Sequence, residues 1–149
     1  MIDWSNDVCC HPGNNWLGRG DISGLELNTK TLFEEFEKVP GSPKIAIMTG
    51  APDHQDYYSN NWKAIQTKVD QVWDWFIKDP KHKKQYFYYK GKPLLIDYVG
   101  TPANRIGLPP WNDDKFTVRH LTGFISEQPT LRDGDFSKYG YWSWEDRNI

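Results

Sequence analysis

Four acidic residues stand where apolar, strand-like runs of this chain end: Asp3, Asp97, Glu145 and Asp146. Catalytic groups of α/β enzymes lie at the carboxyl ends of the sheet strands, so these four are the first candidates for acid/base chemistry. Asp97 directly follows three aliphatic residues, and Glu145 follows a run that contains two tryptophans. Those rings could exclude water from the Glu145 carboxyl group and favour its protonated form, as an acid catalyst requires. We therefore predict that Asp97 and Glu145 form a catalytic carboxylate pair.

Each acid of that pair also has a structural interpretation. Glu145 could form a salt bridge with Arg147, and Asp97 could hold a polar residue of the next strand. Arg119 lies in an otherwise apolar run, and a buried arginine needs a carboxylate partner, so we expect it to pair with Asp97. His120 falls on the opposite side from Arg119 by strand alternation, and we expect it to be a buried packing residue.

Aromatic residues make up 15% of the chain, and many of them stand next to polar residues rather than in apolar blocks. Such rings combine an apolar face with a polar edge. This mixture suits sugars, whose C–H faces stack on rings while their hydroxyl groups need polar partners. Many of these rings could instead fill the core. The residues expected to contact a carbohydrate are Trp4, Asn6, Tyr98, Arg119, Trp142, Trp144 and Asp146.

Composition argues against several other classes of protein. The formal net charge is −2 and the isoelectric point is near 6.1, whereas nucleic-acid binding needs clustered lysine and arginine. No apolar run of the sequence has the length of a membrane span. The adjacent Cys9 and Cys10 lack zinc-site spacing, and we predict neither a metal nor a cofactor. Asp53, His54 and Asp56 place metal-capable side chains in one loop, which keeps a metal-dependent hydrolase open as an alternative.

Helical and strand-like patterns alternate along the chain. Helices are predicted over 29–39, where Thr31 and Glu34 have capping-box spacing, and over 61–78, where apolar residues recur at three- and four-residue steps. Strand-like runs cover 2–4, 44–48, 85–89, 94–99, 116–121 and 139–144. The continuous apolar runs favour a mostly parallel sheet with flanking helices. The sequence therefore predicts an α/β fold, a partial (β/α)8 barrel, with an open doubly wound sheet as the competing arrangement.

Three segments carry a resemblance to a known family. Residues 88–98, YYKGKPLLIDY, resemble the segment that leads through a Gly-Lys-Pro turn into an apolar strand in endo-α-mannosidase-like (β/α)8 glycoside hydrolases. Residues 3–6, DWSN, look like a strand end of some barrel glycosidases. Residues 142–146, WSWED, are similar in character to the late aromatic-acidic motif of that family, Asn-Glu-Trp followed by a second acid, although the order of residues differs.

This resemblance implies a glycoside hydrolase that acts on a polysaccharide or glycan by carboxylate acid/base catalysis. It also implies that residues 1–149 are a single domain, a fragment that covers the central to late strands of a larger barrel. A non-catalytic carbohydrate-binding protein is the second class left open. We expect a carbohydrate ligand, no nucleic-acid or membrane partner, and self-association, because a partial barrel exposes unpaired strand edges. A secreted or periplasmic location would follow if the parent protein degrades polysaccharides.

Overall fold

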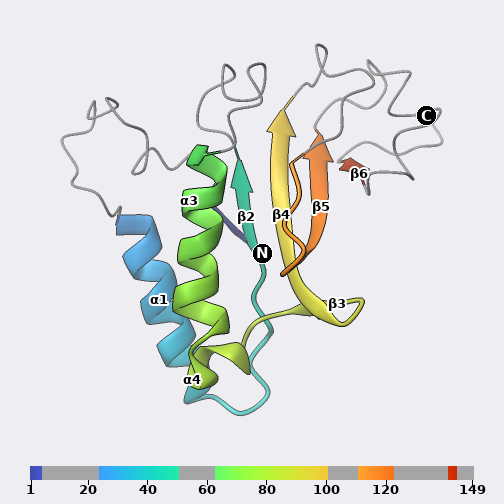
Figure 1. The fold of residues 1–149 in the computed structure, drawn as a ribbon. Coiled ribbons are helices and arrows are strands. Elements are labelled where there is room, and N and C mark those ends of the chain that lie inside the picture. The colour runs from blue at the N-terminus through green and yellow to red at the C-terminus, as the bar shows by residue number, and fades with distance from the viewer. Residues whose placement is uncertain (5–23, 51–62, 101–110, 123–140, 144–149) are drawn as a thin grey trace.

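A parallel β-sheet is the centre of the fold (Figure 1). The computed structural model describes residues 1–4, 24–50, 63–100, 111–122 and 141–143. The parallel strands are β1 (Ile2–Asp3), β2 (Ile47–Gly50), β4 (Lys92–Gly100), β5 (Thr117–Thr122) and β6 (Tyr141–Ser143). They are neighbours in chain order, β1-β2-β4-β5-β6, and each adjacent pair is parallel. The predicted α/β class with a mostly parallel sheet is confirmed.

The helices of the described part lie against one face of this sheet (Figure 1). They are α1 (Gly24–Glu37), α3 (Lys63–Val72), its continuation as the π-helical turn η1 (Trp73–Ile77), and α4 (Pro80–Lys83). Phe33 of α1 stacks on Phe76 of η1 with 4.2 Å between ring centroids. The stack joins the two helical segments above the sheet, in the largest apolar cluster of the molecule's described part.

The helix α1 begins earlier than the sequence predicted. Because Gly24 is its first residue, Thr31 lies inside the helix and does not form the predicted capping box. Its hydroxyl group donates instead to the carbonyl oxygen of Leu27, one turn back, at 3.2 Å. Strand bounds differ in a similar way: the run predicted at 44–48 forms its strand at 47–50. Local patterns locate elements well but place their ends poorly, because end positions depend on tertiary contacts.

Strand alternation gives the sheet two different faces. Ile47, Leu95 and Val118 are paired in register across three strands and pack against the helices. The residues that alternate with them form a second buried cluster, to which no described helix contributes, made of Ala46, Met48, Leu94, Ile96 and Leu121. We call these the helix face and the helix-free face of the sheet.

A tight hairpin precedes the longest strand. The strand β3 (Tyr88–Tyr89) pairs antiparallel with the start of β4 through a turn at Lys90 and Gly91. Both turn residues have positive φ angles, 53° and 83°, as the two-residue hairpin turn with matching twist requires. Tyr86, just before the hairpin, donates its hydroxyl hydrogen to the carbonyl of Leu94 at 2.9 Å. Burial raises the pKa of Tyr86 far above its ordinary value, so it stays a neutral donor.

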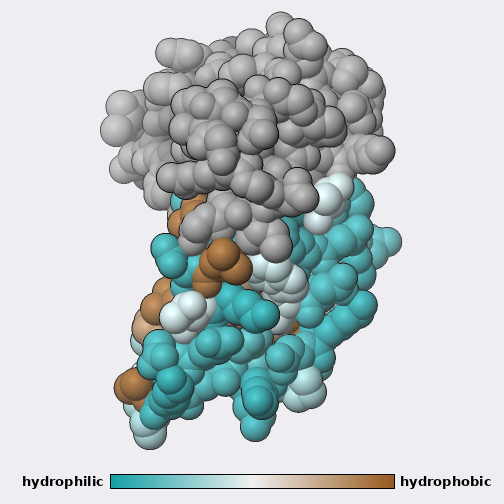
Figure 2. All heavy atoms as spheres, turned by 90° about the vertical axis from the view of Figure 1, so that its left-hand side faces the viewer, coloured by the Kyte–Doolittle hydropathy of each residue, from teal (hydrophilic) through white to brown (hydrophobic). Residues whose placement is uncertain are grey.

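The outer surface of the helical layer is mostly hydrophilic where it is described, with apolar residues in small separate spots (Figure 2). On and after α1 the exposed large apolar residues are Leu25, Leu27 and Val39. Single exposed apolar residues are ordinary on protein surfaces. The chain's described helices include none long and apolar enough to cross a membrane.

Candidate functional site

A row of buried polar side chains crosses the helix face near the carboxyl ends of the strands. Thr49 of β2, Asp97 of β4 and His120 of β5 are neighbours in register, one strand after another. All three are buried, and Asp97 has no exposed surface. The row directly below it on the same face is entirely aliphatic. Buried polar groups cost free energy unless they are bonded, so a polar row at this edge indicates a specific role.

Asp97 and His120 are held against each other within this row. The His120 Nδ1 atom lies 3.2 Å from the Asp97 Oδ2 atom, and the side chains are 3% and 0% exposed. A carboxylate in this position fixes the orientation and tautomer of an imidazole ring. The structure therefore makes His120 the partner of Asp97, in agreement with the burial predicted for His120.

The predicted pairing of Arg119 with Asp97 is wrong. In register, Arg119 lies beside Ile96, and so it projects from the helix-free face while Asp97 projects from the helix face. Adjacent residues of a strand point to opposite faces. A shift of one residue in the pairing of β5 with β4 would therefore place Arg119, rather than His120, beside Asp97. The sequence order of the strands was a correct guide to their neighbours but not to this register.

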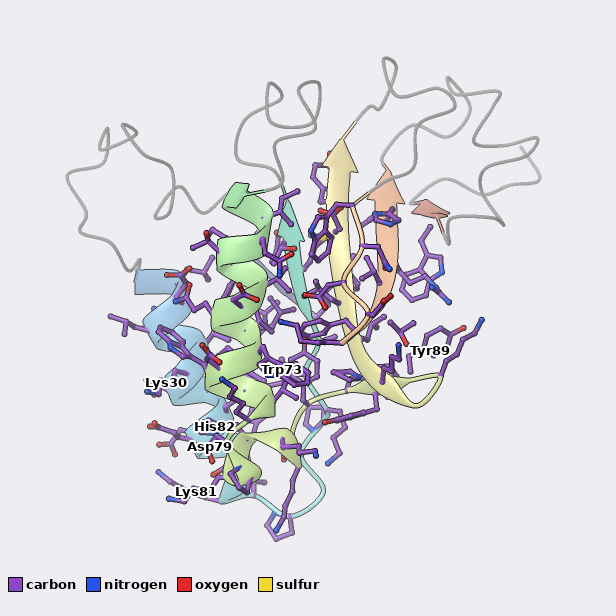
Figure 3. All side chains as sticks on the ribbon, in the orientation of Figure 1. Lys30, Trp73, Asp79, Lys81, His82 and Tyr89 are labelled. Atoms are coloured by element: carbon purple, nitrogen blue, oxygen red, sulfur yellow. The ribbon has the colours of Figure 1, made fainter. Side chains whose placement is uncertain are left out.

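Arg119 is instead held by aromatic rings on the helix-free face. Its guanidinium carbon lies 5.3 Å from the ring centroid of Tyr89 and 5.9 Å from that of Trp142. The two rings meet edge to face at 6.1 Å. Figure 3 shows Tyr89 on the side of the sheet away from the helices. The sequence analysis did not predict Tyr89 as a site residue. The pair of tyrosines directly before the Lys-Gly turn was the available signal.

We call Arg119 and the rings of Tyr89, Tyr98 and Trp142 the Arg119 cluster. Three of its members, Arg119, Tyr98 and Trp142, are residues that the sequence predicted to contact a carbohydrate. Tyr98 shares the helix-free face, and both Tyr98 and Trp142 pack against its apolar cluster. Arg119, Tyr89, Tyr98 and Trp142 are all partly exposed. The Nη1 atom of Arg119 donates to the carbonyl of Val118 at 2.7 Å, which leaves further guanidinium donors. In the part of the chain that the structure describes, Arg119 forms no salt bridge with a carboxylate.

Trp4 is placed in the core rather than on a ligand-facing surface. It follows β1, has no exposed surface, and lies 6.0 Å from Phe76 between ring centroids. Its indole Nε1 donates to the Thr29 hydroxyl of α1 at 3.0 Å. A buried tryptophan with a satisfied N–H group stabilises the contact between β1 and α1.

Several predicted site residues lie outside the described residues: Asn6, Trp144, Glu145 and Asp146. The same holds for the alternative metal loop at Asp53, His54 and Asp56, and for Cys9 and Cys10. Among the residues that are described, no three His, Cys, Asp or Glu side chains come together in a way that could hold a metal ion. The metal-dependent hydrolase that rests on this loop stays an untested alternative.

The fold and site together define a protein of the α/β class with a mostly parallel sheet, a polar row on one face and an aromatic-arginine cluster on the other. Comparisons with protein-family models, with curated proteins and with solved structures found no match to this chain.

Proposed function

We propose that this chain is part of a glycoside hydrolase-like (β/α)8-barrel domain that binds a glycan on the helix-free face of its sheet. The strand order supports a barrel, because each parallel strand lies next to the one before it and the described helices contact one face. Barrels are wound in this way, with helices outside and one strand face inside. A doubly wound sheet reverses its strand order and carries helices on both faces.

The observation that carries the proposed ligand is the Arg119 cluster. Partly exposed rings at Tyr98 and Trp142 offer apolar surfaces for the C–H faces of a sugar. Arg119, held against the rings of Tyr89 and Trp142, offers charged N–H donors to hydroxyl groups. Stacking fixes the long arginine side chain before a ligand arrives, which lowers the entropic cost of binding.

The sequence predicts Asp97 and Glu145 as the catalytic pair. Asp97 projects from the helix face, opposite to the Arg119 cluster, so Glu145, the second residue after β6 in the sequence, is the acid of this pair that we propose to act on a glycan bound by the cluster. Glycoside hydrolysis requires two carboxyl groups across the scissile bond, one as the acid and one as the nucleophile or base. The complete burial of Asp97 beside His120 supports a second candidate function, a carbohydrate-binding protein without catalysis.

Binding and hydrolysis by the full chain test both candidates. Soluble mannan, xylan, β-glucan and their oligosaccharides would be titrated by calorimetry, and new reducing ends would be measured. We expect one glycan class to bind, and Trp142→Ala to weaken it about fivefold or more, because a ring contact contributes roughly 1 kcal/mol. The matched control is Trp75→Ala, which removes a partly buried tryptophan from the helical layer.

The outcomes separate the functions. Hydrolysis that is lost in Glu145→Gln, with the affinity retained, supports the glycoside hydrolase. Binding without any hydrolysis supports the binding protein. Equal loss of affinity in Trp142→Ala and Trp75→Ala, or the absence of binding at millimolar glycan, contradicts the proposed site.

A further inference from the structure

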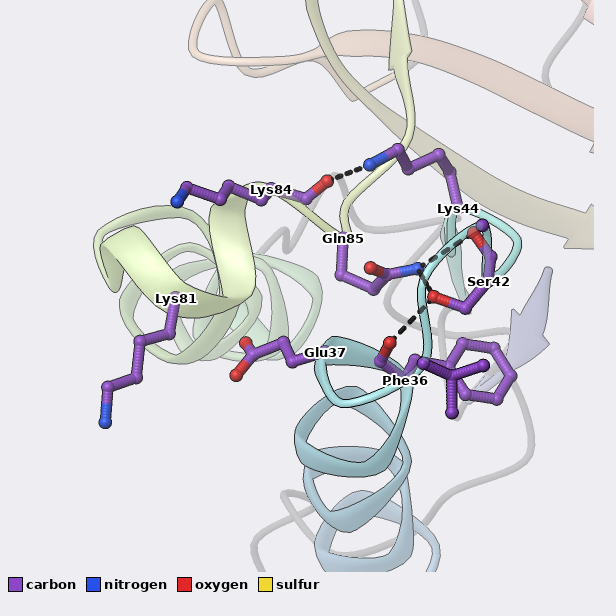
Figure 4. Close-up of a pocket in the computed structure, with 9 residues that line it drawn as sticks. Phe36, Glu37, Ser42, Lys44, Lys81, Lys84 and Gln85 are labelled. Carbon is purple, nitrogen blue, oxygen red and sulfur yellow. Dashed lines mark hydrogen bonds between the residues drawn. The ribbon is translucent and has the colours of Figure 1, made fainter.

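A pocket lies at the end of the molecule where β2 begins, away from the carboxyl ends of the strands. It has a volume of about 460 Å³ and is formed by the end of α1, the loop into β2, and α4 with the residues that follow it (Figure 4). These segments are far apart in the sequence, so the pocket exists only in the folded chain. It shares no residue with the Arg119 cluster.

One wall of the pocket is held in place by neutral hydrogen bonds. The Gln85 Nε2 atom donates to the Ser42 hydroxyl oxygen at 3.0 Å and to the Pro43 carbonyl at 2.6 Å. The Ser42 hydroxyl donates in turn to the Phe36 carbonyl at 2.7 Å. The neutral Ser42 hydroxyl group therefore satisfies the Phe36 carbonyl at the end of α1, and no lysine side chain is needed for it.

The pocket has an excess of positive charge. Lys44, Lys81 and Lys84 line it, and none of them forms a salt bridge with a carboxylate in the described ranges of the chain. Lys44 Nζ donates to the backbone carbonyl of Lys84. The acid in the lining, Glu37, is bonded through Oε1 to His82 Nδ1 at 2.7 Å, and that histidine is buried. Figure 4 shows the Lys81 and Lys84 ammonium groups apart from each other on the side of the Glu37 carboxylate, away from the Lys44 ammonium group.

The pocket also has an apolar part. Phe36 lines it and packs partly against the core, and Val39 lines it with 56% of its surface exposed. A ligand that matches both the lysine part and the apolar part of the pocket needs more than one negative charge and an attached apolar group. A phosphate monoester carries a charge of about −1.5 to −2 at pH 7, and lysine binds phosphate as a point charge.

We propose that this pocket binds a small phosphate monoester that carries an apolar group. The positive charges of Lys44, Lys81 and Lys84 attract the phosphate, and the apolar group contacts Phe36 and Val39.

The test is a titration of the isotope-labelled full chain, followed through its backbone amide NMR signals at low salt. The probes are phenyl phosphate, inorganic phosphate and benzoate. Phenyl phosphate is expected to bind most tightly, because inorganic phosphate lacks the apolar group and benzoate carries a single charge. Saturable shifts at residues 36–44 and 81–85 locate the site, and raised salt weakens it.

Variants with opposite expected effects test the charge argument. Lys81→Met combined with Lys84→Met should weaken phenyl phosphate about fivefold or more, since exposed charge pairs each contribute up to about 1 kcal/mol. Glu37→Gln should tighten it, because a negative charge leaves the pocket while a hydrogen-bond acceptor for His82 remains. Lys83→Met is the matched control, on the same helix but outside the lining, and should bind like the parent chain.

The apolar contact has its own variant. Val39→Ser should weaken phenyl phosphate and leave inorganic phosphate unchanged. The proposal is overturned if no probe gives saturable shifts up to about 10 mM, if Lys83→Met weakens binding as much as the double variant, or if benzoate binds as tightly as phenyl phosphate.

Discussion

At the scale of single residues, the Asp97–His120 contact is the most consequential feature of the strand ends. It joins β4 and β5 inside the helix face, at 3.2 Å, with both side chains buried. A buried carboxylate in such a contact can orient the imidazole or hold the strands, and these roles respond differently to replacement. Removing one partner of a buried pair leaves the other partner without its bond, which is the costly case.

Asp97→Asn is expected to lower the free energy of unfolding by about 1–3 kcal/mol, because a neutral amide replaces the carboxyl group of a buried hydrogen bond. Urea denaturation of the parent chain and the variant measures this difference. The control is Asp74→Asn, whose carboxylate is exposed and pairs with Lys78 on the helix surface, with an expected change below about 0.5 kcal/mol. Unchanged stability of Asp97→Asn together with lost glycan hydrolysis would instead assign Asp97 a direct catalytic role.

At the scale of elements, the β3–β4 hairpin shows how local chemistry positions a ligand residue. The turn at Lys90 and Gly91 fixes the register of β3 on β4, and this register places Tyr89 beside Lys92. Tyr89 then reaches the Arg119 guanidinium on the next strand. The Thr117 hydroxyl donates to the Tyr89 carbonyl at 2.7 Å, which ties the hairpin to β5. The hairpin is therefore a supporting element of the proposed glycan surface.

Two turn variants should change stability in opposite directions. Gly91→Ala forces a side chain onto a residue with φ of 83°, where the added Cβ meets nothing within 4 Å, so the cost is backbone strain alone, about 1–2 kcal/mol. Lys90→Asn introduces a residue that tolerates positive φ and should add a few tenths of a kcal/mol. Thermal and urea denaturation measure both changes. Equal stability of Gly91→Ala and the parent chain would contradict the positive φ of this turn.

At the scale of the whole molecule, the described sheet has short strands at both of its edges. The strand β1 has 2 residues and β6 has 3, and each pairs with one described neighbour. The central strand β4 is paired on both sides. An edge strand is a template for pairing with another chain, which is the physical basis for the predicted self-association.

Sedimentation of the full chain between about 1 and 100 µM tests self-association. We expect the mean mass to rise with concentration, and amide hydrogen exchange in β1 and β6 to slow with it. The amides of β4 serve as an internal control, because their partners lie within the chain. A monomeric mass over the whole range, with no change in edge exchange, would contradict pairing through the edges.

Part of the candidate site followed from the sequence, and part did not. The prediction that Tyr98, Arg119 and Trp142 act together rested on residue types and strand assignment, and the structure places all three on one face. The partner of Asp97 could not be obtained in this way, because it depends on the register between two strands. Trp4 had the same polar neighbours as a ligand-binding ring, yet its contacts with α1 and η1 place it in the core.

Sequence by itself determined the α/β class and the order of the two long helices and the strands. These follow from hydrophobic periodicity and turn chemistry, which act over a few neighbouring residues. Only the tertiary structure decided which side chains come together: Asp97 with His120, Arg119 with Tyr89 and Trp142, and Lys81 and Lys84 in one pocket with the end of α1. The reason is that a one-residue change in strand register moves every side chain of that strand to the other face of the sheet, while the hydrophobic pattern of the sequence stays the same. The packing of the helix face selects one register, and that selection places each candidate residue.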